Sequence, residues 1–298
     1  MNIEVKKQFD EYKKLIEQKL DEFIPIQYPE EIWDSMRYSV LAGGKRLRPL
    51  LTLETCKVIS GSYEQAIPTA CAIEMLHSQS LIHDDLPCMD NDDYRRGKPT
   101  NHKVFGESTA VLAGDALLSF APQIIIQKTP INKNGVNQEK ILKVLEEFLV
   151  AAGAEKLIAG QVVDLASEGK QINEDTLNFI HRNKTGALFK LAMRTGAMLG
   201  NANEKQLQAV TEYAEKIGLA FQIMDDILDV TSTLEELGKT PGKDEKDGKV
   251  TYISFYGLET SKAKLSSLCE EACAILEENN IKSDVLKAVA ESIYERIS

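Results

Sequence analysis

Two short acidic segments carry the side chains most able to do chemistry in this sequence. One runs from Asp84 to Asp90, and the other is Asp225-Asp226-Ile227-Leu228-Asp229; each follows an apolar stretch. On a helix, Asp225 and Asp229 are four residues apart and lie on the same face. Two carboxylates on one face repel each other unless a cation lies between them, so this spacing suggests a bound metal ion.

The first segment needs a bend to bring its ends together. Asp84 and Asp90 are six residues apart, and on a straight helix they would point in different directions; Pro87 is expected to break the helix and turn Asp90 back. A solvated acidic helix end would explain a single pair of aspartates, but two such segments favour Mg²⁺, which binds one or two carboxylates together with phosphate oxygens and water. Mn²⁺ is an alternative ion. The candidate ligands are Asp84, Asp85, Asp90, Asp225, Asp226 and Asp229.

Basic runs near these acids would suit a phosphorylated substrate. Gly43-Gly44-Lys45-Arg46-Leu47-Arg48-Pro49 and Arg95-Arg96-Gly97-Lys98 both place cations beside a flexible turn. Arginine holds phosphate oxygens with two nitrogens, and lysine adds a mobile charge. Either run alone would be explained by an exposed basic turn. A later loop with Lys239, Lys243 and Lys249 is expected to act as a lid, and its spacing does not match a Walker loop.

Composition limits the possible classes of protein. The 298 residues include 35 Lys or Arg and 46 Asp or Glu, which gives a net charge of 35 − 46 = −11 and argues against a general nucleic-acid-binding protein. The first twenty residues lack the apolar core of a secretory signal, so we expect a cytoplasmic protein. No membrane span is expected, because Ser108–Gln127 contains Asp115 and Pro122 and is better explained as a buried helix. The five cysteines show no metal-site spacing and are expected to be reduced core thiols.

The pattern of apolar residues predicts an all-α protein. Apolar side chains recur at intervals of three and four, as in Ile32, Trp33, Met36 and Val40, and no window is a convincing strand. Pro29 suits the start of a helix, Gly43-Gly44 its end, and Asn173 the cap of another. Because apolar helical segments continue along the chain without a shift in composition, residues 1–298 are expected to form one domain.

The combined motifs closely resemble those of the short-chain trans-isoprenyl diphosphate synthases, the polyprenyl synthetase family. The resemblance covers almost the whole chain and includes the two aspartate segments, both basic runs, Gly160-Gln161, Lys184-Thr185-Gly186 and Phe221-Gln222. It implies a bundle of antiparallel helices around a central cavity, the isoprenoid synthase fold, and a homodimer. It also implies condensation of isopentenyl diphosphate with an allylic diphosphate, with several Mg²⁺ ions in each active site.

The resemblance also assigns roles to individual residues. The six aspartates would bind Mg²⁺, and Lys184, Thr185 and Gln222 would be catalytic. Lys45, Arg48, His77 and Arg96 would bind isopentenyl diphosphate. Arg95, Lys184, Lys239 and Lys249 would bind the allylic diphosphate. A lone histidine such as His77 is otherwise more often a core residue.

Alternative functions stay open at this point. A terpene cyclase would ionise a prenyl diphosphate without a second substrate, but Lys45, Arg48 and Arg96 then would have no diphosphate to hold. A non-catalytic partner subunit would be expected to lack part of an aspartate segment, and both segments are complete. Within the synthases, the product could have fifteen or twenty carbons.

Residues upstream of Asp84 are expected to face the growing prenyl tail and to form the floor that limits its length. They are Met75, Leu76, Gln79 and Ser80. Synthases of this family that stop at fifteen carbons commonly have an aromatic residue at one of the last two positions. This chain has none there, which favours geranylgeranyl diphosphate, with farnesyl diphosphate as the alternative.

We therefore predict that Gln79→Tyr shortens the product, because the larger ring would close the cavity sooner. Chromatography of the products made by the variant and by the parent protein measures the effect. Identical product lengths would rule out this assignment of the floor.

Overall fold

The computed structural model describes residues 2–232 and 249–296, and it confirms the all-α prediction. A short 3₁₀ turn, η1, spans Glu64–Ala66, and a π-helical segment, η2, spans His181–Thr185. The α-helices are α1 (Ile3–Phe23), α2 (Glu30–Val40), α3 (Leu47–Ser60), α4 (Ile67–Asp84), α5 (Asn101–Phe105), α6 (Glu107–Lys128), α7 (Gln138–Ala152), α8 (Leu157–Ser167), α9 (Glu174–Ile180), α10 (Gly186–Leu199), α11 (Glu204–Thr231), α14 (Tyr252–Tyr256), α15 (Leu258–Glu278) and α16 (Asp284–Glu295).

One small hairpin departs from the prediction that no strand forms. Within the described ranges the strands are β1 (Tyr94–Arg95) and β2 (Lys98–Pro99), which pair antiparallel. The two turn residues Arg96 and Gly97 have φ values of 54° and 75°. Positive φ at both central residues is typical of the tight turns whose twist matches paired strands. The hairpin was missed because its strands are only two residues long and show no alternation.

Several helix boundaries follow the sequence signals. Asn173 caps α9 by accepting a hydrogen bond from the Thr176 N–H, as predicted. After α2 ends at Val40, Gly43 and Gly44 adopt φ values of 88° and 126°, which are strained for any residue with a side chain. Helix α3 then begins at Leu47, two residues before Pro49, so the proline lies in the first turn as expected.

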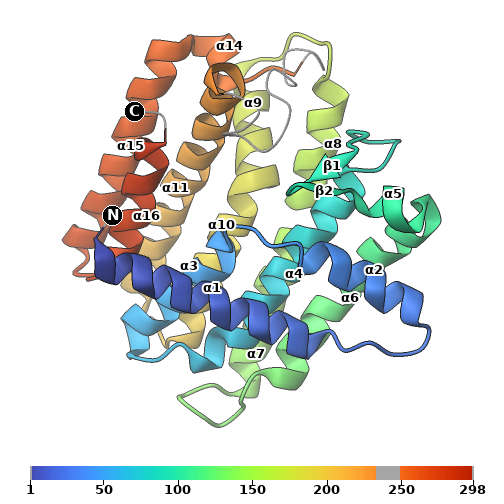
Figure 1. Cartoon of the computed structure of the whole chain (residues 1–298). Coiled ribbons are helices and arrows are strands. Elements are labelled where there is room, and N and C mark those ends of the chain that lie inside the picture. Colours follow the sequence, from blue (N-terminus) through green and yellow to red (C-terminus); the bar gives the residue numbers. More distant parts are fainter. Residues whose placement is uncertain (1, 233–248, 297–298) are drawn as a thin grey trace.

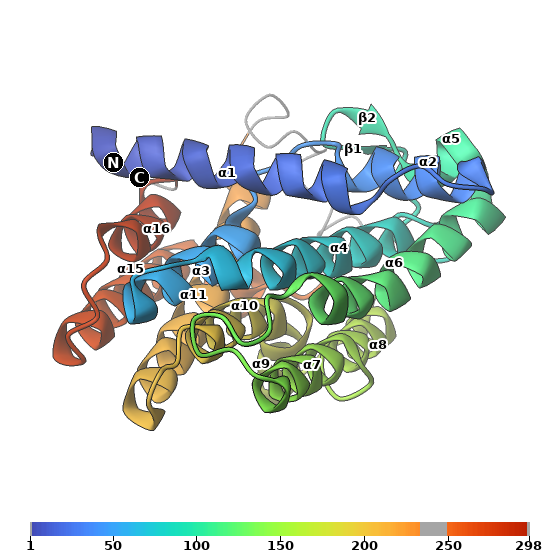
Figure 2. The same cartoon turned by 90° about the horizontal axis from the view of Figure 1, so that it is seen from below.

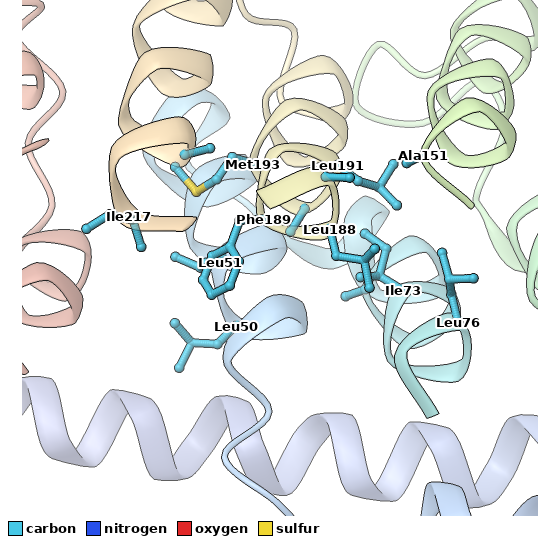
Figure 3. Packing of buried hydrophobic residues seen from close by; sticks show 14 of the residues in the cluster. Leu50, Leu51, Ile73, Leu76, Ala151, Leu188, Phe189, Leu191, Met193 and Ile217 are labelled. Atoms are coloured by element: carbon cyan, nitrogen blue, oxygen red, sulfur yellow. The ribbon is translucent and has the colours of Figure 1, made fainter. Parts of the chain in front are cut away.

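Helix α10 lies at the centre of the bundle and packs against α3, α4, α7 and α11 (Figure 1). Figure 3 shows Leu51 of α3 beside Phe189 of α10, and Leu188 of α10 beside Ile73 of α4; all four belong to one continuous cluster of buried apolar residues. The helices approach closely at Gly196, where an added Cβ would lie 2.4 Å from the Thr52 carbonyl oxygen. Any larger residue would push α10 away from α3, so this glycine fixes the crossing.

The first and last helices pack against the outside of the bundle and against each other. Helix α1 crosses α3, α4 and α16 (Figure 2). A buried carboxylate, Glu54 of α3, joins these segments: the Tyr12 hydroxyl donates to it at 2.8 Å and the Ser283 hydroxyl at 2.5 Å. These contacts hold the terminal helices to the core.

Helix α6 is less buried than predicted. Residues such as Leu112 and Ile126 are more than half exposed, although Ala113, Leu117 and Ile124 face the core. By length and composition alone, α6 is the one described helix that could span a membrane, and 39% of its apolar window is buried inside the protein. Packing against α2 and α4 explains the buried part; the exposed apolar part forms a surface that another molecule could cover.

The cysteine prediction is correct for three of the five residues. Cys56, Cys71 and Cys269 are buried, and burial raises the pKa of Cys56 and Cys269 to about 12, as expected for inert core thiols. Cys273 is half-buried. Cys88 is exposed, because it lies in the turn that follows α4 rather than in a helix.

Candidate active site

The first aspartate segment bends as predicted. Helix α4 ends at Asp84, and the chain turns through Pro87 so that the Asp90 N–H donates to the Asp84 carbonyl at 2.9 Å. Asn91 then takes a left-handed φ of 49°, which asparagine tolerates better than most residues. The turn therefore returns Asp90 to the end of the helix that carries Asp84.

Asp84 is a half-buried acid that none of the described side chains pairs with. Burial raises the pKa of its carboxyl to about 6, with Asp90 raising it and Lys184 lowering it. Its side chain makes no hydrogen bond or ion pair with the residues that the structure describes. A bound cation would relieve this arrangement, so the donor set fits a metal ion at Asp84.

Asp85 is engaged by the hairpin that follows. Arg95 of β1 donates from Nε to Asp85 Oδ1 at 2.7 Å and holds Asp92 at 3.3 Å from its Nη2. Burial raises the pKa of Asp85, although Arg95 opposes the shift. In this state Arg95 is therefore paired with an acid of the first segment rather than turned outward.

The π-helical segment η2 carries two predicted catalytic residues, Lys184 and Thr185. Short π-helical turns are frequent at functional sites. Helix α8 can touch this segment because Gly160 has no side chain: an added Cβ would lie 2.4 Å from the Lys184 backbone nitrogen. This close approach explains the Gly160-Gln161 motif. Lys184 donates to Asp164, which is one turn farther along α8, at 2.6 Å.

Thr185 begins a chain of hydrogen bonds into the second aspartate segment. Its hydroxyl donates to Gln222 Oε1 at 2.8 Å, and Gln222 Nε2 donates to Asp226 Oδ1 at 2.9 Å. The Tyr252 N–H donates to the other Asp226 oxygen at 2.7 Å. Both oxygens of Asp226 are thus held by protein groups, so its fixed position supports Gln222 and Thr185.

The remaining acids of α11 face the basic side of the site. Asp225 lies close enough to raise the pKa of both Lys45 and Arg48 against the opposing effect of burial. Asp229 is only 3% exposed. Lys249 lies 3.3 Å from Asp90 and so links the chain after α11 to the first segment. Lys239 lies outside the described residues, and its role stays a prediction.

The cations of the basic run after α2 do not all face the cavity. Arg46 is buried and donates to Glu74 of α4 at 2.5 Å, so this cation faces the core. Arg96 lies 3.5 Å from the same carboxylate and donates to the Gly43 carbonyl at 2.5 Å. Gly44 permits this packing, because an added Cβ would lie 3.0 Å from Arg96 Cζ.

Arg48 and His77 form the basic wall of the main cavity. Their Nη1 and Nε2 atoms are 3.5 Å apart, and the Arg48 guanidinium lies 5.0 Å from the centre of the Phe189 ring. The pKa of His77 is held well below its ordinary value, mainly by burial and next by the positive charge of Arg48, so the ring is neutral at pH 7. Burial lowers the pKa of Arg48 to about 10, which leaves the guanidinium charged.

Two hollows meet at Lys184 and Thr185. The larger, of about 430 Å³, extends from Arg48, His77 and Asp84 past Gln79 and Ser80 to apolar walls on α6, α7, α8 and α10. The smaller, of about 120 Å³, includes Asp164, Gln222, Asp226 and Lys249. Half of the predicted site residues therefore line these two hollows, and they come from segments far apart in the sequence.

The floor residues divide into two pairs. Gln79 and Ser80 line the larger cavity. Met75 and Leu76 are fully buried in the core and are not among the residues that line it, because they lie about one turn farther back on α4. The apolar walls of the cavity include Leu118 of α6, Ala152 of α7 and Leu188 of α10.

The described side chains do not by themselves form a complete metal-binding site. In the described part of the chain, no group of three or more His, Cys, Asp or Glu side chains is placed to hold a metal ion. Mg²⁺ characteristically uses only one or two carboxylates and completes its shell with phosphate and water, so the donor set still suits it.

Two acids that organise the site were missed in the sequence. Glu74 pairs with Arg46 and Arg96, and Asp164 pairs with Lys184. Each is an acid inside an apolar helical stretch, and such a residue is almost never buried unless it is paired. That signal could have identified both residues, but not their partners.

Known proteins resemble the chain along nearly its whole length. A family model described as polyprenyl synthetase matches residues 29–293. A dimethylallyltranstransferase from Fischerella ambigua (strain UTEX 1903) is 50% identical over 95% of this chain and 81% of its own length. A geranylgeranyl diphosphate synthase from Cyanophora paradoxa is 50% identical over 96% and 94%. The crystal structure of an FPP/GFPP synthase from Zymomonas mobilis superposes with a TM-score of 0.87 at 34% identity, covering 99% of this chain and 100% of that one.

The environment of Asp84 predicts that Asp84→Asn stabilises the metal-free protein. Because the folded-state pKa is about 6 and the ordinary value is 3.8, ionised Asp84 costs stability above pH 6. The gain should be on the order of 1–3 kcal/mol at pH 8 and should shrink as the pH falls from 6 toward 4. Urea unfolding in the presence of a chelator measures it.

The exposed Asp115→Asn on α6 is the matched control and should leave the free energy of unfolding unchanged. A loss of stability in Asp84→Asn at pH 8 would contradict the unpaired state of Asp84.

Proposed function

The chain belongs to the polyprenyl synthetase family, and we propose that it condenses isopentenyl diphosphate with an allylic prenyl diphosphate to make geranylgeranyl diphosphate. It is a transferase of the prenyl diphosphate synthase type. The relatives at about 50% identity include a geranylgeranyl diphosphate synthase, which favours the twenty-carbon product over the fifteen-carbon alternative.

The observation that carries this proposal is the polarity of the larger cavity. Its lining combines the charged groups of Arg48, Lys184 and Asp84 with apolar side chains from several helices, such as Leu118, Leu165 and Leu188. A prenyl diphosphate has the same combination, with a charged head and a long apolar tail. Buried apolar walls also keep water away from a carbocation, which would otherwise be converted to an alcohol.

Mg²⁺ would be held by Asp84 and Asp90 on one side and by Asp225 and Asp229 on the other. When bound, it would supply positive charge to the diphosphate leaving group. Asp85 and Asp226 already bind Arg95 and the Gln222–Tyr252 pair, so their contribution in this state is to hold those groups in place.

The chain's own cations bind the allylic diphosphate and stabilise its departure. Lys184 and Lys249 both line the smaller hollow, each beside an acid, and Arg95 lies at the first aspartate segment. Positive groups fixed before the reaction lower the barrier most where negative charge develops. Thr185 lines both hollows and Gln222 the smaller one, so their hydrogen-bonded oxygen atoms would lie beside the positive charge that develops on carbon.

The second substrate has its own basic wall. Arg48 and neutral His77 line the larger cavity, while Lys45 and Arg96 lie on the adjoining turn and hairpin. Gln161 also lines this cavity, and its side-chain nitrogen is buried without an acceptor among the described residues. A substrate oxygen would satisfy that donor. A terpene cyclase would have no use for this second set of cations.

We also propose that the protein is a homodimer. Consecutive contacting helices α6, α7 and α8 expose large apolar side chains on their outer surfaces. Contiguous exposed apolar area of this kind usually marks an interface. We call this set the α6–α8 apolar surface, and its members are Val111, Leu112, Ile126, Leu142, Leu149 and Val150, with Ile158 and Val162 of α8 at the point where it meets the larger cavity that they also line.

The activity is tested by incubating the purified protein with Mg²⁺, isopentenyl diphosphate and dimethylallyl, geranyl or farnesyl diphosphate in turn. We expect diphosphate release coupled to chain growth, with a twenty-carbon main product, and loss of both with a chelator. Lys184→Ala should reduce kcat/KM for the allylic substrate by roughly 100-fold, because one charge on the leaving group is removed. The exposed Lys190→Ala on α10 is the matched control.

Each failure has a distinct meaning. No diphosphate release from any substrate pair would contradict catalysis and would favour a non-catalytic subunit. Release without chain growth would favour a cyclase, and arrest at fifteen carbons would favour a farnesyl diphosphate synthase.

The dimer is tested with Leu112→Glu combined with Leu149→Glu, which places charges on the α6–α8 apolar surface. Light scattering after gel filtration should show a dimer for the parent protein and a monomer for the variant, because buried unpaired charges are costly. Ile3→Glu, at an apolar and still more exposed position on α1, should leave the dimer intact. A parent protein that is monomeric at micromolar concentration would contradict the proposal.

A further inference from the structure

His83 connects the wall of the larger cavity to helix α6. Its Nδ1 lies 3.1 Å from Gln79 Nε2, and its Nε2 lies 3.1 Å from the Val111 carbonyl oxygen. A carbonyl oxygen can only accept, so Nε2 carries the proton and Nδ1 accepts from the Gln79 amide. Gln79 and His83 both line the cavity, and Gln79 is only 9% exposed. The two hydrogen bonds therefore fix a polar side chain in the path of the prenyl tail.

Gly114 provides the space for this histidine. A Cβ built on Gly114 would lie 1.9 Å from His83 Nε2, 2.4 Å from Cδ2 and 2.7 Å from Cε1. All three distances are far below ordinary contact, so the imidazole lies directly over the Gly114 Cα. Gly114 itself is buried and has an ordinary helical backbone, so close approach, not a special φ, is what requires glycine here.

The same face of α6 reaches the cavity one turn later. Val111, Gly114 and Leu118 are three and four residues apart, which places them along one side of the helix. Val111 accepts from His83, Gly114 lies under its ring, and Leu118 lines the cavity. Movement of the His83 ring away from α6 is therefore movement toward the space that a growing tail occupies.

We propose that His83 and Gly114 are positioning residues for product length: Gly114 admits the His83 ring, and the ring holds Gln79 against the cavity wall. This proposal rests on the proposed prenyl-elongating function. Neither residue touches the reacting atoms, and both act through Gln79. A glutamine amide that kept its length but lost this anchor would turn into the cavity and close it earlier.

Gly114→Ala tests the proposal directly. The added methyl group must displace His83, break its bond to Val111 and release Gln79, and we expect a shift toward fifteen carbons. The ratio of twenty- to fifteen-carbon product should fall roughly tenfold, which corresponds to about 1.4 kcal/mol between the competing barriers. Alanine also favours helix over glycine, so α6 should still form. Ser119→Ala, at an exposed position on the same helix, is the matched control.

A double variant separates this mechanism from a general disturbance of the helix pair. In His83→Ala the ring is gone, so adding Gly114→Ala should produce no further shortening relative to His83→Ala alone. Product lengths are measured by chromatography at equal conversion, with dimethylallyl diphosphate as starter so that both fifteen- and twenty-carbon products are formed by the enzyme, and circular dichroism checks folding. Non-additivity of this kind is the signature of residues that act through contact.

Two outcomes would overturn the proposal: an unchanged product ratio in Gly114→Ala, or the same shortening by Gly114→Ala whether or not His83 is present. Failure of the proposed function gives a different result, because the parent protein would then elongate no allylic diphosphate at all. If the parent protein elongates normally and the variants leave its product length unchanged, only the role of His83 and Gly114 is contradicted.

Discussion

The need to pair buried charges is the constraint on which the rest of this structure depends. Around the cavity, Glu74 binds Arg46 and Arg96, Asp164 binds Lys184, and Asp85 binds Arg95. Each pair joins two different helices or turns, and removing the partner of a buried acid such as Glu74 or Asp85 would leave an uncompensated buried charge. The pairs therefore set the positions of α4, α8, the β1–β2 hairpin and η2 relative to one another. Asp84 is the exception, because none of the described side chains pairs with it, and its carboxylate marks where an external cation fits.

Close backbone approach makes this pairing possible. Gly160 lets α8 contact η2, which brings Asp164 within 2.6 Å of Lys184. Gly44 lets Arg96 pack on the turn that contains Lys45. The glycines of the sequence motifs thus act by having no side chain, and the charged residues beside them act because the glycines bring them near. Motifs that seem separate along the chain are parts of the same contacts.

The helical class could be predicted from the sequence because apolar periodicity is a local signal, and the acidic and basic runs identified the site residues that stay predictions. Capping by Asn173 and the bend at Pro87 could also be predicted, since both depend on neighbours within a few residues. Pairings across the fold could not be predicted: Arg46 was grouped with the phosphate-binding cations, yet it binds Glu74 in the core. Met75 and Leu76 were assigned to the floor from helical spacing, whereas the apolar lining of the cavity comes from α6, α7, α8 and α10.

A polar residue such as Gln79 can line an apolar cavity because its amide is satisfied there. An unpaired buried amide costs free energy, whereas one that donates to His83 costs little. The same bond makes the side chain rigid, so the cavity keeps a defined shape without a bulky aromatic ring. Apolar side chains of four other helices, such as Leu118 of α6, Ala152 of α7, Leu165 of α8 and Leu188 of α10, line the rest of the cavity. The cavity thus combines a fixed polar group from α4 with apolar walls. Because four helices build those walls, the space for the tail depends on their packing as well as on Gln79 and the hydrogen bond that holds it.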